Sequence, residues 1–174
     1  MSSEKSPPRR RRSTLTPRTA TRKTPARAPI IPSKTASGQN AKPRPPEPGA
    51  IIDYGYLWAR EDAKGQENAT KTRPCYIYGV KPIDGLYIVS VMAISSSSTG
   101  ARVPVHPRER AALGLPDDCD VVIEEVNVFQ WSGPDIVPQS DGSLMRANPA
   151  SKKLTTAIGT AMIGRTPTIV FRAT

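Results

Sequence analysis

The clearest pattern along the chain is a pair of apolar runs separated by a turn signal. Residues 74–80 and 86–94 are apolar at nearly every position, which is typical of central strands covered on both faces. Asp84-Gly85 between them favours a tight hairpin turn. Pro74 has no backbone N–H to donate, so we expect it at the start of its strand. These residues predict an antiparallel hairpin at the centre of the fold.

Shorter patterns predict one brief helix and further strands around this hairpin. The helix is expected over residues 107–113, because Pro107 suits its first turn and Gly114 its end. Residues 59–72 are polar with alternating charge, and they predict a loop of a length that often serves function. The remaining strands are expected at residues 51–58, 101–105, 121–131 and 167–172.

The last helix has the most regular period. Its apolar positions recur at helical spacing, with Asn148-Pro149 expected to start the helix and Gly164 to end it. These positions are Leu154, Ala157, Ile158, Ala161 and Met162. The whole pattern predicts a mainly β fold with short helices, in which a small and strongly bent antiparallel sheet or partial barrel carries a C-terminal helix.

Charge divides the chain near residue 47. Residues 1–47 hold 12 of the 25 Lys and Arg residues and only two of the 15 acidic residues, whereas residues 48–174 hold 13 of each. The first aromatic residue is Tyr54, and Pro, Ser and Thr are dense before it. Such a segment buries too little apolar surface to offset its chain entropy. We therefore expect a disordered basic, Pro-rich tail over 1–47 and a folded domain over 48–174.

The tail leaves two interpretations open. Its arginines could hold nucleic acid loosely through phosphates, with an affinity that falls steeply with salt. It could equally be a solvated linker that binds no specific partner.

Several classes of protein are disfavoured by what the sequence lacks. No run of about 18 apolar residues predicts a membrane span, and no secretory apolar core follows the N-terminal charges. Cys75 and Cys119 form no CxxC motif, so we expect a reducing cytoplasm and a small core residue at Cys75. The single histidine, His106, has no Cys/His cluster around it, so neither a metal nor a cofactor is expected. His106 is interpreted as a helix cap, and a catalytic role is the alternative.

Pairing arithmetic in the hairpin brings a candidate site together. A three-residue loop would place Arg73 opposite Ser95, whereas a two-residue turn would place it opposite Ser96. Side chains opposed in this way lie about 5 Å apart, so a guanidinium and a hydroxyl could hold a phosphate between them. The alternatives are a surface charge or an ion pair at Arg73, with Glu61, Asp62 or Glu67, and a plain loop at residues 95–99.

Four segments resemble one known family. They are residues 49–54 (GAIIDY), Tyr56-Leu57-Trp58, Lys71-Thr72-Arg73-Pro74-Cys75, and residues 127–135 (NVFQWSGPD). Together they look like the MazF/PemK-type toxins of type II toxin–antitoxin systems, in the branch with YLW, RPC and GPD motifs. The likeness covers roughly residues 48–145. It implies an SH3-like antiparallel barrel, a homodimer, a metal-independent endoribonuclease activity and neutralisation by an antitoxin protein.

The resemblance also implies roles for particular residues. The family's catalytic arginine corresponds to Arg73, and the hydroxyl residue that ends its third strand corresponds to Ser95. Residues 59–72 correspond to the loop that shapes the RNA groove. The contacts expected with RNA, including a base stacked on an aromatic ring, come from Lys64, Lys71, Thr72, Ser96 and Tyr56.

The reaction expected from this resemblance is attack by the RNA 2′-hydroxyl, which leaves a 2′,3′-cyclic phosphate on single-stranded RNA. A non-catalytic module of the same fold that binds protein or nucleic acid is the alternative. A third interpretation makes the basic tail the functional part. The aromatic residues Tyr54, Tyr56 and Trp58 could also belong to the core rather than to an RNA surface.

Overall fold

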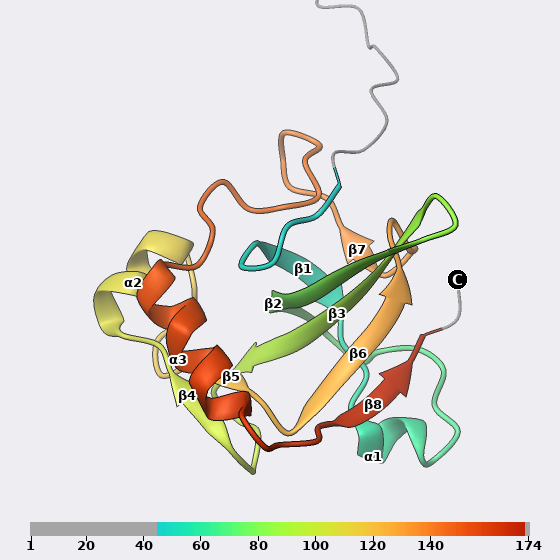
Figure 1. Cartoon of the computed structure of the whole chain (residues 1–174), viewed down its shortest axis with the longest axis horizontal. Coiled ribbons are helices and arrows are strands. Elements are labelled where there is room, and N and C mark those ends of the chain that lie inside the picture. Colours follow the sequence, from blue (N-terminus) through green and yellow to red (C-terminus); the bar gives the residue numbers. More distant parts are fainter. Residues whose placement is uncertain (1–44, 173–174) are drawn as a thin grey trace, which may run out of the picture. The chain divides into compact units, whose positions relative to one another are not determined.

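The computed structural model describes residues 45–172 of the chain (Figure 1). The chain divides into two units, residues 1–39 and 40–174, and the predicted tail at 1–47 lies almost wholly outside the described residues. Eight strands and three helices make up the described part. In chain order they are β1 (Ile51–Gly55), α1 (Ala59–Asp62), β2 (Thr72–Ile83), β3 (Leu86–Ser95), β4 (Arg102–Pro104), α2 (Pro107–Leu113), β5 (Asp120–Val122), β6 (Glu125–Gln130), β7 (Ile136–Val137), α3 (Lys152–Met162) and β8 (Thr168–Phe171).

The predicted hairpin is confirmed, and its register contains a bulge. Ile83 pairs with Leu86, so Asp84-Gly85 forms a two-residue turn in which both residues have positive φ, 48° and 79°. The pairing shifts by one residue between Ile77 and Gly79, where β2 contains one more residue than β3. Beyond this bulge Cys75 pairs with Ala93. Extended by two residues, this register would set Arg73 across from Ser95, and it arises from a bulge rather than from a three-residue loop.

Strand β3 organises the sheet (Figure 1). It pairs with β2 along one edge, and with β6 and then β5 along the other, always antiparallel. β1 pairs with β2 and β7, and β4 pairs with β5. The predicted antiparallel sheet is confirmed, with one parallel pair, because β8 runs parallel to β6 after the long connection that contains α3.

The predicted barrel is also wrong in its closure. Within residues 45–172 the strand path ends at β7 on one side and at β4 on the other, while β8 pairs only with β6. Both ends of the path are short strands, of two and three residues, and each is bonded to one neighbour. A barrel requires its first and last strands to pair, so this is a bent open sheet.

Two apolar clusters pack on the two faces of β3. Met92 and Ile94 belong to a cluster that includes Leu154, Ile158 and Met162 of α3, and Figure 1 shows this helix lying beside the sheet. Residues of opposite parity, Val89 and Val91 among them, belong to the second cluster, which contains the aromatic residues of β1 and β6. The prediction that this strand is covered on both faces is therefore confirmed.

The helix termini bear out some predictions and correct others. α2 has the predicted bounds; His106 Nδ1 accepts a hydrogen bond from the Arg108 N–H at 3.3 Å, and Gly114 follows with φ 61°. The cap predicted for the last helix is wrong, because Ser151 Oγ accepts from the Leu154 N–H and the helix begins after it. Of the apolar positions predicted for its buried face, Leu154, Ile158 and Met162 are buried, whereas Ala157 is exposed.

Three segments differ from the predicted strands and loops. The strand predicted over residues 51–58 ends at Gly55, and the loop predicted next begins with the short helix α1. The strand predicted over residues 121–131 is divided between β5 and β6, because the chain leaves the sheet between them. β7 was not predicted; it contains only two residues.

Candidate functional site

The turn between β1 and α1 contacts β6, which lies far from it in the sequence. Asn127 is fully buried, and its side chain accepts a hydrogen bond from the Leu57 N–H at 2.9 Å and donates one to the Leu57 carbonyl at 2.7 Å. The Tyr56 hydroxyl donates to the Glu125 carbonyl at 2.9 Å. The YLW segment and the segment that begins at Asn127 are thus joined through buried polar contacts, although 70 residues separate Leu57 from Asn127.

Carboxylates hold the start of α1. Glu61 Oε2 accepts from the Trp58 N–H at 3.2 Å, and Glu125 Oε2 accepts from the Ala59 N–H at 2.6 Å. The other oxygen of Glu61 accepts from the Thr70 hydroxyl at 3.1 Å. These bonds satisfy amides at the helix start that have no partner within the helix, and they tie α1 to the loop that follows it.

Arg73 lies on the indole of Trp58. Its guanidinium carbon is 5.2 Å from the ring centre, a cation–π distance, and its Nη1 donates to the carbonyls of Tyr56 and Lys71 at 3.4 and 3.3 Å. Neither of the two ion pairs found among residues 45–172 includes Arg73, so the alternative of an ion pair with Glu61 is not realised there. In the same residues Nε and Nη2 of Arg73 donate to no partner.

Ser95 ends β3 and is 8% exposed. It pairs with Asp120 of β5, and its Oγ accepts a hydrogen bond from the Ser97 N–H at 3.3 Å. Strand alternation places Arg73 and Ser95 on the sheet face of Cys75 and Ala93. Their observed contacts lead to different neighbours, since Arg73 extends to Trp58. A phosphate held between the two side chains stays a prediction.

The aromatic residues belong to the core. Tyr56 is 0% exposed and meets Trp58 edge to face, and the buried ring of Tyr54 stacks on Phe129 at 4.5 Å. The expected stacking of a base on Tyr56 is therefore corrected, because no face of this ring reaches solvent. The other residues expected to contact RNA are exposed: Lys64, Lys71, Thr72 and Ser96.

A polar hollow of about 310 Å³ lies beside the start of β2. One wall consists of residues 68–72, which include Lys71 and Thr72, and the opposite wall contains Pro134 and Asp135. The Gly55 N–H donates to the Asp135 carbonyl at 2.8 Å, which holds the GPD segment against the end of β1. Two of the segments that carry the family resemblance therefore line one hollow.

Arg172 is the residue of this region that the sequence pattern did not single out. Its Nη2 pairs with Asp135 Oδ2 at 2.8 Å, its Nη1 donates to the Glu67 carbonyl, and its side chain is only 7% exposed. Through these contacts Arg172 ties the loop before β2 to the GPD segment.

Asp135 also affects the pKa values of its neighbours. Burial opposes the charge of Arg172, but the hydrogen bond and the charge of Asp135 outweigh burial and raise the pKa of Arg172. Burial, and then the charge of Asp135, raise the pKa of Tyr54.

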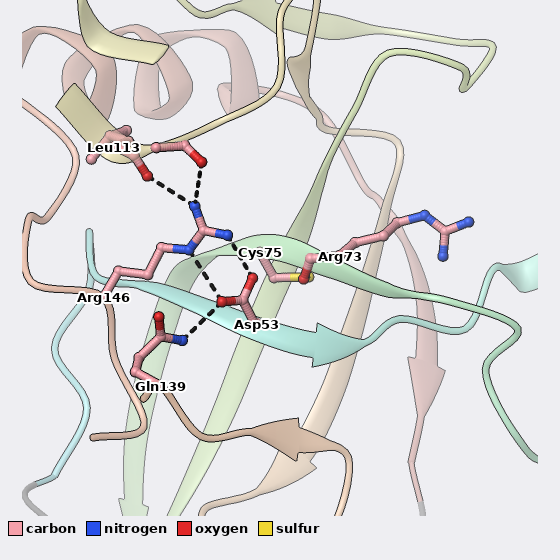
Figure 2. Close-up of polar contacts among 7 residues, drawn as sticks. Asp53, Arg73, Cys75, Leu113, Gln139 and Arg146 are labelled. Atoms are coloured by element: carbon pink, nitrogen blue, oxygen red, sulfur yellow. Dashed lines mark hydrogen bonds and ion pairs between the residues drawn. The ribbon is translucent and has the colours of Figure 1, made fainter. Parts of the chain in front are cut away.

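A second polar cluster lies around Asp53, the middle residue of β1 (Figure 2). Arg146 pairs with Asp53 at 2.6 Å and donates to the carbonyls of Leu113 and Gly114, and Gln139 donates to Asp53 at 2.8 Å. Burial of Asp53 works against its charge, yet these hydrogen bonds leave its pKa below the ordinary value. Figure 2 shows the side chain of Arg73 pointing away from this cluster.

The contacts of this cluster are those of a structural anchor. They fasten the end of α2 and the segment before α3 to β1. Cys75 is fully buried, and burial raises the pKa of its thiol, so the prediction of a core residue is confirmed.

No family model matches the chain, and no curated protein or solved structure matches it. No helix among the described residues is long and apolar enough to cross a membrane. In that part of the chain, no group of three or more His, Cys, Asp and Glu side chains could hold a metal ion.

Proposed function

We propose that this chain is a metal-independent endoribonuclease of the MazF/PemK type, which cleaves single-stranded RNA at a site built around Arg73. The observation that carries the proposal is that the Arg73 guanidinium is held in place while part of its hydrogen-bonding capacity stays free. It is fixed by Trp58 and two carbonyls, it has no carboxylate partner among residues 45–172, and two of its nitrogen donors are unused there. Such a fork suits the non-bridging oxygens of a phosphate.

In the proposed reaction the RNA supplies its own nucleophile. The 2′-oxygen attacks phosphorus as it loses its proton, the bond from phosphorus to the 5′-oxygen breaks, and that oxygen takes up a proton. The products are a 2′,3′-cyclic phosphate and a 5′-hydroxyl. Arg73 stabilises the charge that grows on the phosphorane, as preorganised donors do in other phosphoryl and acyl transfers. Ser95 Oγ already accepts from Ser97, which leaves its O–H to donate to the phosphate.

The RNA strand is proposed to follow the hollow beside β2. Lys71 and Thr72 line the hollow, and Lys64 and Ser96 are exposed residues in the turns that follow α1 and β3. Tyr56 is not retained as a base-stacking residue because it is buried. We place this activity in the cytoplasm, with an antitoxin protein as a possible partner.

A homodimer belongs to the same proposal. Ile169 and Phe171 on β8 are 50% and 75% exposed, and they lie on the sheet face of Val126 and Val128 of β6. Within the described residues β8 pairs on one edge only. Large apolar side chains on an edge strand favour pairing with a second copy, and we propose that a second copy covers them.

The direct test is cleavage of a defined single-stranded RNA in the presence of EDTA, with the ends of the fragments identified. Arg73→Ala is expected to lower the rate roughly a hundredfold or more, the usual effect of removing a transition-state donor. Arg108→Ala, which removes an exposed arginine of α2, is the matched control and should cleave normally.

Normal cleavage by Arg73→Ala would overturn the site assignment. Binding of RNA by the unaltered chain without any cleavage would instead support the non-catalytic module.

A further inference from the structure

A second arginine shares the indole ring on which Arg73 lies. The guanidinium carbon of Arg60 is 5.7 Å from the centre of the Trp58 ring, and that of Arg73 is 5.2 Å from it. The two carbons are therefore at most 10.9 Å apart, the sum of these distances. Arg60 lies on α1, and its side chain is exposed.

Neither of the two arginines forms an ion pair in the described part of the chain. The two ion pairs there use Arg146 and Arg172, and neither includes Arg60 or Arg73. Two carboxylates beside α1 are already engaged, since Glu61 accepts from the Trp58 N–H and Glu125 from the Ala59 N–H. Two like charges at most 10.9 Å apart lie within or near one Debye length, which is about 10 Å at roughly 0.1 M salt, so they repel each other. An anion bound between or beside them relieves that repulsion.

Trp58 contacts both charges and is not itself a surface for bases. It is 4% exposed, since Tyr56 meets its ring edge to face and both guanidiniums lie over it. The hydrogen bonds of Tyr56 and Leu57 to β6 fix the backbone that carries it. The ring is therefore a rigid platform that sets where the two guanidiniums stand.

We infer that Arg60 binds a second phosphate of the same RNA strand, beside the phosphate that Arg73 holds. This inference rests on the proposed function and extends it to a residue outside the cleavage step. Phosphates of one strand follow each other at about 3.4 Å of rise in a helix and farther apart when the strand is extended. A separation of at most 10.9 Å therefore suits neighbouring phosphates of a flexible single strand.

The salt dependence of binding tests this inference. The probe is a 2′-O-methyl oligouridine decamer, which cannot be cleaved by 2′-hydroxyl attack. Its affinity is measured by fluorescence anisotropy over a range of salt concentrations, for the full chain and for Arg60→Gln, Arg73→Gln and Arg108→Gln. The slope of log affinity against log salt becomes shallower by roughly 0.7 for each phosphate of a single strand that the protein no longer neutralises.

Arg60→Gln is expected to reduce the slope by about 0.7, the double variant with Arg73→Gln by about 1.4, and the control Arg108→Gln by nothing. The affinity of Arg60→Gln should fall roughly two- to fivefold, the usual contribution of an exposed charge pair. The basic tail is present in every variant, so differences in slope come from the substituted residue alone. Unchanged thermal unfolding of Arg60→Gln shows that the fold is retained.

Each outcome is decisive. A slope for Arg60→Gln equal to that of the unaltered chain overturns the inference, even if RNA is bound and cleaved. Loss of affinity for an acidic Glu-rich peptide, with RNA binding unchanged, would assign Arg60 to a protein partner and overturn it too. Failure of the unaltered chain to bind the decamer would instead remove the proposed function itself.

Discussion

The buried bond between Asn127 and Leu57 allows the sharpest prediction for stability. Asn127→Ala removes both side-chain bonds and leaves the Leu57 N–H and carbonyl without partners, and Leu57 is itself buried. Each buried polar group left unpaired costs about 1–3 kcal/mol, so the variant should lose about 2–6 kcal/mol. That is a large part of the roughly 5–15 kcal/mol by which a typical domain is stable.

Urea unfolding followed by tryptophan fluorescence measures this loss. With a slope of about 2 kcal/mol per molar urea, the midpoint should fall by about 1–3 M while the slope itself stays constant. Asn148→Ala is the matched control, because its side chain also donates to a backbone carbonyl, that of Ala112 at 2.9 Å, but is exposed. The control should stay within about 0.5 kcal/mol of the unaltered chain. Equal midpoints for the two variants would refute the reasoning.

Two further predictions concern acid stability and assembly. Asp53 has a lowered pKa in the folded state, so its contacts stabilise the fold above the ordinary carboxyl pKa of 3.8, and this contribution is lost as pH falls through the folded value. The stability difference between the unaltered chain and Asp53→Asn should therefore be constant near neutral pH and shrink below about pH 4, as followed by urea unfolding; a difference that grows on acidification would contradict this. Phe171→Glu places a charge on the exposed face of β8 and should convert a dimer into a monomer in light scattering, whereas a dimer that persists would remove this face as the interface.

Local signals were enough to predict the centre of the fold. The hairpin of β2 and β3 follows from two apolar runs and a turn that only Asp-Gly-like residues adopt easily, and α2 follows from Pro107 and Gly114. The features that were missed depend on residues far away in the chain. α1 is held at its start by Glu125, and the parallel pairing of β8 with β6 is made only after the connection through α3.

The same division applies to the candidate site. The position of Arg73 near the entrance of β2 could be predicted from the apolar run that follows it. The strand begins at Thr72, however, so the predicted start at Pro74 is wrong by two residues, because β1 already pairs with Thr72 and Arg73. Its contact with Trp58 could not, because a cation–π contact leaves no spacing signal in the sequence. Tyr56 was misassigned because an aromatic residue after a strand has the same sequence pattern whether it packs inward or faces solvent.

The bulge in β2 has an evolutionary consequence. Tyr78 has no partner on β3, since Ile77 pairs with Val91 and Gly79 with the next residue, Ser90. The odd-numbered side chains of residues 72–77 therefore lie on one face of the sheet, and those of residues 79–83 lie on the other. Deleting Tyr78 would leave every cross-strand partner in place. Deleting a residue from either flank would instead shift the register of part of that flank, and its side chains would move to the opposite face of the sheet. Single-residue length changes in descendants of this chain should therefore be accepted in the middle of the ribbon.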